Sequence, residues 1–238
     1  MNNEFIIGVL GGMGTQATIH LFQQYASLFP AEKEWDRPRI IIDNRCTMPS
    51  RVRAYLYNEN VNQLVEQMTD SLKQFMNENC TKIILDCNTS HLFLPFIYEK
   101  IPELEQRVVN IINCCVDLIS NDKVAEVYIL GTEGTVDSGI YQNALGKKGV
   151  KAFAPSQTEY HKLRSCIEAV KQNVYTDEVI NTFLELVNRY EYCILGCTEL
   201  PILYEKCKEK VLCKKIYDPL YIALQIVHDD FLKVKGQK

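Results

Sequence analysis

The chain has 238 residues, 47% of them hydrophobic and 24% charged, which is the composition of a globular protein large enough for one sizeable domain or two small ones. Lysine and arginine (26) are fewer than aspartate and glutamate (30), so the net charge of −4 gives no global positive field for nucleic acid or an acidic membrane. The apolar run Phe5 to Leu10 is only 6 residues long and follows no Lys or Arg, which argues against a signal peptide or membrane span. We therefore expect a cytoplasmic protein whose partners include neither nucleic acid nor membrane.

Short apolar runs alternate along the chain with longer segments of helical period. The runs that predict strands are, in chain order, Ile6–Leu10, Arg39–Ile42, Lys82–Leu85, Val108–Ile112, Val127–Leu130, Lys151–Phe153, Tyr192–Leu195 and Lys215–Tyr217. Apolar stripes within residues 61–75, 163–170 and 179–187 predict helices between them. Continuous apolar strands separated by helices are typical of parallel sheets covered on both faces, so we expect an α/β fold.

The two halves of the chain carry similar turns. Residues 10–15, which hold three glycines, resemble residues 130–135, and residues 84–89 resemble residues 194–198 around a cysteine in each segment. Each turn follows a strand-like run. The repetition predicts two similar α/β lobes that face each other, each offering one cysteine.

The expected lobes are closely packed, because no segment rich in Pro, Gly or Ser separates them. Residues 1–107 plus 212–238 are predicted to form the first lobe, and residues 108–211 the second. The final stretch, roughly Tyr217 to Leu232, is expected to be a helix that returns to the first lobe.

Two of the ten cysteines, Cys87 and Cys197, stand where chemistry is expected. Each follows a predicted strand, and ligands of parallel sheets bind beyond the carboxyl ends of strands. A helix N-terminus there would lower the thiol pKa toward working pH. A lone cysteine of this kind is more often part of the core, but two in matching contexts favour catalysis. Opposed thiols suit inversion of a stereocentre, since one face needs a base and the other an acid.

The sequence resembles a known family at these same positions. Three segments resemble the signatures of aspartate racemases, which belong to the cofactor-independent aspartate/glutamate racemase superfamily: Gly8–Gly14, Cys87–His91 and Gly196–Pro201. The resemblance extends to Gly131–Thr135 with Ser138 and Tyr141. Glu199 is similar to the aspartate branch, whereas glutamate racemases usually have His there. The resemblance implies two α/β lobes around one active site, a homodimer, and proton transfer between two bases without cofactor or metal.

Carried over residue by residue, the resemblance makes Cys87 and Cys197 the two catalytic bases acting on a small amino-acid substrate. The resemblance implies substrate-binding roles for Met13, Arg51, Asn88, Thr89, Ser90 and Lys171. Thr198, next to Cys197, can also donate a hydrogen bond to a bound carboxylate. Asn88 to Ser90 match the segment that holds the α-carboxylate, and Arg51 and Lys171 match cations for the side-chain carboxylate. A surface ion pair is the competing interpretation for Arg51, and a solvated pair with Glu168 for Lys171.

One departure from the family bears on the substrate. Ser50 stands where the family usually has Asp, before Arg51, which changes the charge beside the side-chain site. We therefore expect an acidic amino acid, aspartate first, with glutamate or a broader set as alternatives. Decarboxylation or isomerisation of a small dicarboxylic acid is a further alternative within the superfamily.

Three other interpretations are weaker. Gly12-x-Gly14-x-x-Ala17 fits a dinucleotide-binding fingerprint, but Asp43 lies further away than the roughly 20 residues that a ribose ligand requires, and the paired cysteines stay unexplained. A metal site could use Cys87 with His91 or Cys193 with Cys197, yet no C-x-x-C pair occurs, and Cys193 lies inside a predicted strand, where residues four apart do not share a helical face. An amino-acid sensor that kept the fold would need neither cysteine.

Overall fold

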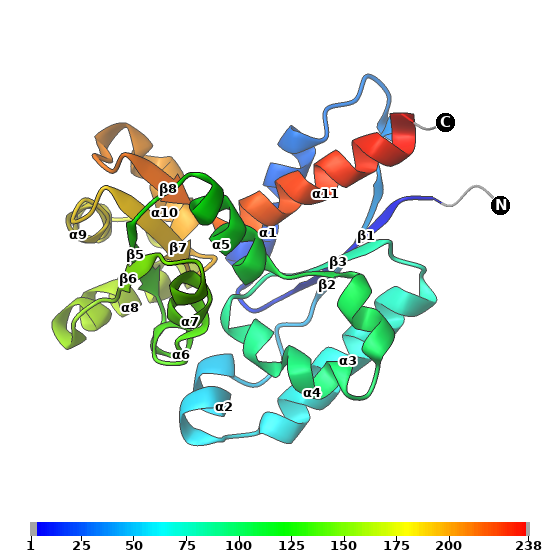
Figure 1. The fold of residues 1–238 in the computed structure, drawn as a ribbon, viewed down its shortest axis with the longest axis horizontal. Helices are drawn as coiled ribbons and strands as arrows, with labels where there is room; N and C mark the ends of the chain where they lie inside the picture. The colour runs from blue at the N-terminus through cyan, green and yellow to red at the C-terminus, as the bar shows by residue number, and fades with distance from the viewer. Residues whose placement is uncertain (1–3, 237–238) are drawn as a thin grey trace.

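The computed structural model describes residues 4–236, and within them the strands form two parallel four-stranded sheets, one in each half of the chain (Figure 1). In spatial order the first sheet contains β2 (Arg39–Asn44), β1 (Ile6–Gly11), β3 (Lys82–Leu85) and β4 (Val108–Val109). The second contains β6 (Lys151–Phe153), β5 (Glu126–Gly131), β7 (Tyr192–Gly196) and β8 (Lys215–Tyr217). The expected α/β fold of parallel sheets is confirmed.

Helices cover both sheets. In chain order they are α1 (Thr15–Leu28), α2 (Arg51–Tyr57), α3 (Val61–Asn77), α4 (Leu94–Tyr98), α5 (Ile111–Asn121), α6 (Glu133–Val136), α7 (Ile140–Lys147), α8 (Gln157–Lys171), α9 (Asp177–Val187), α10 (Leu200–Cys207) and α11 (Pro219–Gly236). Short 3-10 helices lie at Glu34–Asp36, Thr89–Phe93, Pro102–Gln106 and Lys208–Lys210. The three apolar stripes of the sequence coincide with α3, α8 and α9. Within residues 4–236 no helix is long and apolar enough to cross a membrane.

The repeat predicted from the turns is present in the topology. In both sheets the first strand of the half is central, with the second strand on one side and the third and fourth on the other. Leu10 pairs with Leu85 at the end of the first sheet, and Leu130 pairs with Leu195 in the second. The glycine turn and the cysteine turn of each lobe therefore lie side by side at the carboxyl edge of its sheet.

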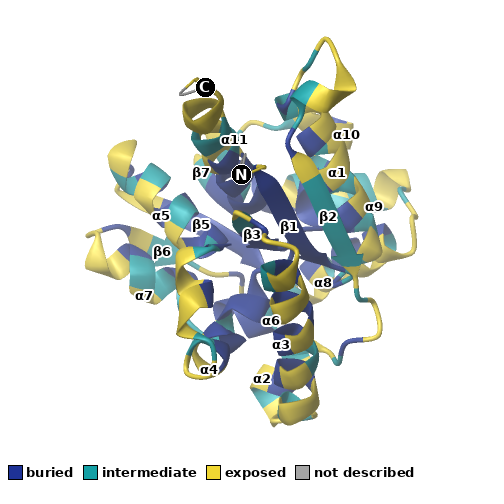
Figure 2. Cartoon of the chain, turned by 90° about the vertical axis from the view of Figure 1, so that its right-hand side faces the viewer, coloured by how far each residue is buried: buried dark blue, intermediate teal, exposed yellow. Residues whose placement is uncertain are grey.

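A shared core joins the lobes. The inner faces of both sheets contribute to one buried apolar cluster together with α1, α5 and α11, which lie between them (Figures 1 and 2). Separate clusters lie under α3 and α4 on the first lobe and under α8 to α10 on the second. As expected, α11 returns to the first lobe: Lys82 Nζ lies 2.9 Å from Asp230 Oδ2, and the rings of Phe5 and Phe231 are 5.6 Å apart.

Several boundaries differ from the sequence prediction, most of them by one or two residues at a strand end. The expected strand Val108–Ile112 ends at Val109, because the Asn110 side chain accepts hydrogen bonds from Ile112 N and Asn113 N and starts α5. By strand pairing, β4 belongs to the first sheet and β8 to the second, so the chain leaves the first sheet after Val109 and the second after Tyr217. The sequence-based division had placed residues 108–109 and 215–217 in the opposite lobes. Its outer ends, residues 1–3 and 237–238, lie outside the described range.

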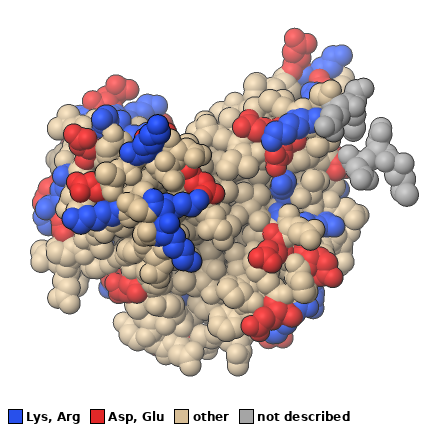
Figure 3. Space-filling model, viewed as in Figure 1, with Lys and Arg blue, Asp and Glu red and all other residues tan. Residues whose placement is uncertain are grey.

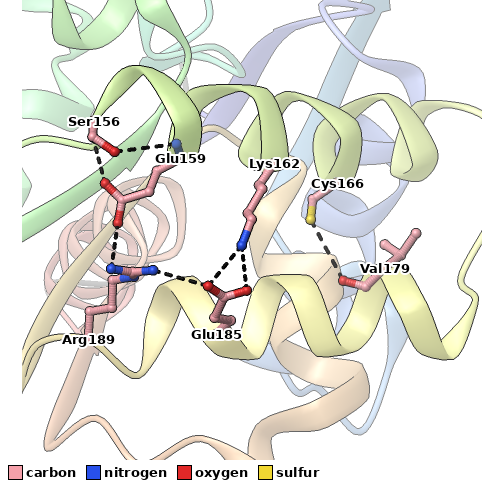
Figure 4. Close-up of polar contacts among 7 residues, drawn as sticks. All are labelled: Ser156, Glu159, Lys162, Cys166, Val179, Glu185 and Arg189. Atoms are coloured by element: carbon pink, nitrogen blue, oxygen red, sulfur yellow. Dashed lines mark hydrogen bonds and ion pairs between the residues drawn. The ribbon is translucent and has the colours of Figure 1, made fainter.

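Helix α8 is fixed to its neighbour by polar contacts. Ser156 and Glu159 form a capping box at its start, and Arg189 pairs with both Glu159 and Glu185 (Figure 4). Lys162 adds a further ion pair to Glu185 at 2.8 Å. These contacts fix the course of α8, whose last residue reaches the cleft between the lobes. Over the face seen in Figure 3, acidic and basic side chains are interspersed.

Candidate active site

The two predicted catalytic cysteines, one from each lobe, line a single cavity. Cys87 follows β3 and Cys197 follows β7, and both border a cavity of about 70 Å³ between the lobes, here called the inner cavity. Its other lining residues are Met13, Ser50, Arg51, Val52, Asn88, Thr89, Thr132, Thr135, Lys171, Gly196, Thr198 and Glu199. All predicted site residues except Ser90 therefore lie on its wall.

A larger cavity of about 340 Å³, the outer cavity, adjoins the inner one. The two share Ser50, Val52, Thr132 and Lys171 in their walls. Helix α2 of the first lobe and helix α8 of the second border the outer cavity. The cleft is therefore wider beyond Lys171 than at the two thiols.

The turn that carries Cys87 is held by side chains on its own segment. Ser90 is fully buried, and its hydroxyl donates to Cys87 O at 2.6 Å; His91 Nδ1 lies 2.9 Å from the same oxygen. Burial lowers the pKa of His91 to about 4, so the ring is neutral near pH 7 and its Nδ1–H donates to the carbonyl. Ser90 thus supports the turn from behind and does not line the cavity.

Cys197 has a carboxyl partner two residues further along the chain. Its Sγ donates to Glu199 Oε2 at 2.9 Å, and both side chains are buried. Burial raises the pKa of the Cys197 thiol well above its usual range, and the neighbouring Glu199 charge raises it further, against the opposing effect of Lys171. The expectation of a thiol pKa lowered by a helix N-terminus is wrong for Cys197, because desolvation and the adjacent carboxylate outweigh the helix dipole.

Two buried donors on the cavity wall have no hydrogen-bond partner within residues 4–236. They are Asn88 Nδ2 and Arg51 Nε. Tyr141 donates to Asn88 Oδ1 at 2.5 Å, which fixes the amide so that its nitrogen is the free end. Arg51 donates from Nη2 to Met13 O at 2.6 Å and from Nη1 to Pro49 O at 3.1 Å. Buried donors left unpaired are costly, and an anionic ligand would satisfy both.

Threonine hydroxyls connect the lobes across the inner cavity. Thr89 Oγ1 of the first lobe lies 2.8 Å from Thr135 Oγ1 and 3.4 Å from Thr132 Oγ1 of the second. Both partners belong to the segment that repeats the glycine turn of the first lobe. Sequence reasoning identified Thr89 as a carboxylate donor but attached no role to Thr132 and Thr135.

Lys171, the last residue of α8, borders both cavities and pairs with Glu168 at 3.0 Å. Burial lowers its pKa, but the hydrogen bond to Glu168 and the nearby Glu199 outweigh burial, so the net pKa is raised and the side chain is cationic. The solvated ion pair and the cavity position, considered as alternatives from the sequence, occur together.

Glu199 is the residue whose part in the site sequence reasoning missed. The sequence marked it only as a feature of one family branch, whereas the fold buries it against Cys197 and Gly14. A Cβ added at Gly14 would overlap Glu199 Oε1, so the glycine loop of the first lobe leaves room for this carboxylate. The glycine at 14 is thus accounted for by packing across the lobes. In the part of the chain that the structure describes, no group of three or more His, Cys, Asp or Glu side chains is arranged to hold a metal ion.

A family profile for Asp/Glu/hydantoin racemases matches residues 10–227, which is most of the chain. The chain belongs to the Asp/Glu/hydantoin racemase family. It is 23% identical over 214 residues to the broad specificity amino-acid racemase RacX of Bacillus subtilis (strain 168), a match that covers 87% of this chain and 90% of that protein. It is also 26% identical over 156 residues to the glutamate racemase of Aquifex pyrophilus, which covers 65% of this chain and 59% of that one.

Solved structures of the racemase family have the same fold. The aspartate racemase of Picrophilus torridus superposes with a TM-score of 0.77 at 23% identity, covering 98% of this chain and 94% of that one. An aspartate racemase homologue from Pyrococcus horikoshii gives a TM-score of 0.73 at 21% identity, covering 95% and 98%. The expected family, the two-lobed α/β fold and the enzyme class, an amino-acid racemase, are confirmed.

Proposed function

We propose that this racemase inverts an acidic amino acid, aspartate first, by moving the α-proton between Cys87 and Cys197. The observation that carries the proposal is that one thiol from each lobe borders the same small cavity. A substrate Cα held between them would have a sulfur on either face. Removing the proton from one face of Cα and delivering a proton to the opposite face inverts the configuration at Cα.

The charges and donors of the cavity support an anionic amino acid as the substrate. Asn88 Nδ2 and Arg51 Nε, the buried donors on the cavity wall without partners among the described residues, would each donate to a carboxylate oxygen. Lys171 adds a positive charge at the junction of the two cavities. The amide of Asn88 and the cations of Arg51 and Lys171 are enough to bind two substrate carboxylates. This favours a dicarboxylic amino acid as the substrate.

The surroundings of Cys197 support an order for the first turnover. Because burial and Glu199 raise its pKa, Cys197 is the protonated partner in the resting enzyme. Cys87 is then the base that takes the α-proton, and Cys197 donates its proton to the opposite face of Cα. After one turnover the two thiols have exchanged protonation states, and the reverse reaction begins from that form.

A broader specificity is the second candidate, favoured by Ser50. This residue borders both cavities and its hydroxyl accepts from Arg53 N at 3.3 Å at the start of α2. It brings no charge next to Arg51, where an aspartate would restrict the substrate electrostatically. The similarity to a broad specificity racemase supports the same candidate.

We propose further that the enzyme is a cytoplasmic homodimer. Ten cysteines that are all free within the structure suit a reducing compartment. On α1, Ile19 and Phe22 stand one turn apart with 48% and 47% of their surfaces exposed, an apolar face that a second copy could cover. Light scattering after gel filtration tests the dimer; a mass of one chain across micromolar concentrations would contradict it.

The experiment that tests the reaction follows the α-proton of L-aspartate and L-glutamate by NMR in D2O, with reduced protein and no added cofactor. Two-base transfer predicts that early D-product carries deuterium while the remaining L-substrate keeps its protium. Chiral chromatography identifies the product. Absence of both exchange and inversion for these two substrates would refute the proposal, and a panel of other amino acids and dicarboxylic acids would then test the alternatives.

Single substitutions test the roles of the two thiols. Cys87→Ser and Cys197→Ser should each reduce racemisation in both directions by a factor of about 10² or more, the scale of general acid–base catalysis. Cys166→Ser is the matched control, since Cys166 is a buried cysteine on α8 whose thiol donates to the carbonyl of Val179, at 3.7 Å (Figure 4). Full activity in either catalytic-site variant would contradict the two-base assignment.

A further inference from the structure

A second pair of cysteines lies apart from the catalytic cavity. Cys193 is buried within β7, and Cys213 is half-buried in the segment between the 3-10 helix Lys208–Lys210 and β8. Their sulfur atoms are 3.6 Å apart. Because β7 and β8 are neighbours in the second sheet, with Cys193 opposite Ile216, the two thiols are brought together by strand pairing.

Both thiols point at the same backbone oxygens. Val187 O, at the end of α9, lies 3.2 Å from Cys193 Sγ and 2.5 Å from Cys213 Sγ. Tyr190 O lies 3.8 Å and 3.1 Å from the same two sulfurs. The carbonyls hold the two side chains toward one point, so the sulfurs have to approach each other by only about 1.5 Å to reach the length of a disulfide bond.

The two thiols are not equivalent. The contact between the two sulfurs lowers the pKa of Cys213, and the same contact together with burial raises the pKa of Cys193. Of the two thiols, Cys213 is therefore the one that solvent reaches and the one that loses its proton more readily. A partly accessible thiolate beside a buried thiol is the arrangement of a reactive cysteine and its resolving partner.

We propose that Cys193 and Cys213 form an oxidant-sensitive pair that closes to an intrachain disulfide in the presence of hydrogen peroxide. The Cys213 thiolate attacks one peroxide oxygen, the O–O bond breaks, and hydroxide leaves, so Cys213 becomes a sulfenic acid. The sulfur of Cys193 then attacks the sulfur of Cys213, the S–S bond forms, and water leaves as the Cys193 proton is released. In sum, two thiols give two electrons to one peroxide and yield a disulfide and two waters.

The position of the pair predicts its effect on the enzyme. Cys193 is near the start of β7, whereas Cys197 follows the end of that strand at the cavity. The bond would tie the segment before β8 to β7 without entering the inner cavity. We therefore expect the oxidised protein to unfold at a higher urea concentration than the reduced protein, because the closed loop restricts the unfolded chain.

Peptide mapping of the native protein tests the proposal. The full chain is treated with a small excess of hydrogen peroxide, blocked with iodoacetamide before denaturation, and digested with trypsin without reductant. The expected product joins residues 190–206 to residues 211–214 with the loss of two hydrogens. The first peptide also contains Cys197, so fragment ions must place the bond at Cys193. A bond at Cys197, or free thiols at both 193 and 213 while the exposed Cys46 is oxidised, would overturn the proposal.

Variants separate the two roles. In Cys193→Ser the sulfenic acid has no resolving thiol, so a dimedone adduct should accumulate on Cys213; in Cys213→Ser little adduct should form on Cys193. Cys166→Ser, which has no thiol neighbour among the described residues, should retain the cross-linked peptide. Equal labelling of Cys193 and Cys213 would contradict the assignment of Cys213 as the reactive thiol. None of these readouts depends on racemase activity.

Discussion

The thiol of Cys197 donates to the carboxylate of Glu199 across 2.9 Å, and both groups are buried beside the cavity that also contains Cys87. The carboxylate is itself costly to bury, and desolvation raises its pKa, with the thiol and Lys171 as partial compensation. On the turn of Cys87 the Ser90 and His91 side chains bond to the backbone oxygen of Cys87, and the neighbouring Asp86 carboxylate accepts from Thr18. Each lobe therefore supplies a cysteine at the equivalent position, but only Cys197 has a carboxylate bonded to its thiol among the described residues.

Replacing Glu199 should change the ionisation of Cys197. Glu199→Gln keeps the shape and an acceptor but removes the negative charge that raises the thiol pKa, so this pKa should fall. Native-state alkylation of Cys197 by iodoacetamide at pH 8 should become at least about threefold faster, with tenfold corresponding to one pKa unit. The limb of the kcat/KM pH profile that reports Cys197 should move to lower pH. Glu209→Gln, at an exposed position, is the control; equal alkylation rates in all three proteins would contradict the prediction.

A side chain at position 14 should displace the same carboxylate. Its backbone is extended (φ −137°), a conformation open to alanine, but the added Cβ would overlap Glu199 Oε1. Gly14→Ala should therefore displace Glu199, lower kcat/KM about tenfold or more and cost roughly 1–3 kcal/mol of unfolding free energy. Gly146→Ala, where a Cβ would meet nothing within 4 Å, should leave activity unchanged. Steady-state kinetics and urea unfolding of both variants decide the matter, and wild-type kcat/KM in Gly14→Ala would show that Glu199 is dispensable.

Arg51 should act mainly in binding. Its Nη atoms are held by Met13 O and Pro49 O, which leaves Nε as the unpaired donor toward a substrate carboxylate. Arg51→Lys removes the fork geometry and should raise KM about tenfold, roughly 1.4 kcal/mol, with a smaller change in kcat. Arg39→Lys, in an exposed pair with Glu78, should change neither constant. A fall in kcat at unchanged KM would instead assign Arg51 to the chemical step.

His91 should make the fold sensitive to acid. Burial lowers its pKa to about 4 from an ordinary 6.5, so below pH 6.5 the unfolded chain takes up a proton that the folded chain refuses. Stability from this residue is present above pH 6.5 and is lost as the pH falls to about 4, by at most about 3 kcal/mol. His91→Asn keeps a donor near Cys87 O and should flatten the fall in urea-unfolding free energy between these values. His161→Asn, on the exposed face of α8, should retain the wild-type slope; parallel curves for wild type and His91→Asn would be inconsistent with this origin.

Local patterns in the sequence determined the strands, the main helices and the two repeated turns. Apolar residues recur at helical spacing from Val61 to Phe75, and runs such as Ile6–Leu10 are apolar throughout. Each segment therefore favours one type of secondary structure independently of its tertiary contacts. The repetition around Cys87 and Cys197 could also be recognised in the sequence, because similar turns after similar strands place equivalent residues at equivalent sheet edges. These signals were sufficient for the fold class and for the two candidate thiols.

Contacts between residues distant in the sequence were decided only by the tertiary structure. Glu199 meets Gly14 because the two lobes close on each other, and Asn88 has a fixed amide because Tyr141 of the other lobe donates to it. The Ser90 side chain bonds to the Cys87 carbonyl and points away from the cavity, a direction that is set by the local backbone conformation of the turn. The meeting of Cys193 and Cys213 requires the pairing of β7 with β8. Side-chain direction and desolvation depend on what surrounds each group, and those surroundings exist only after the chain has folded.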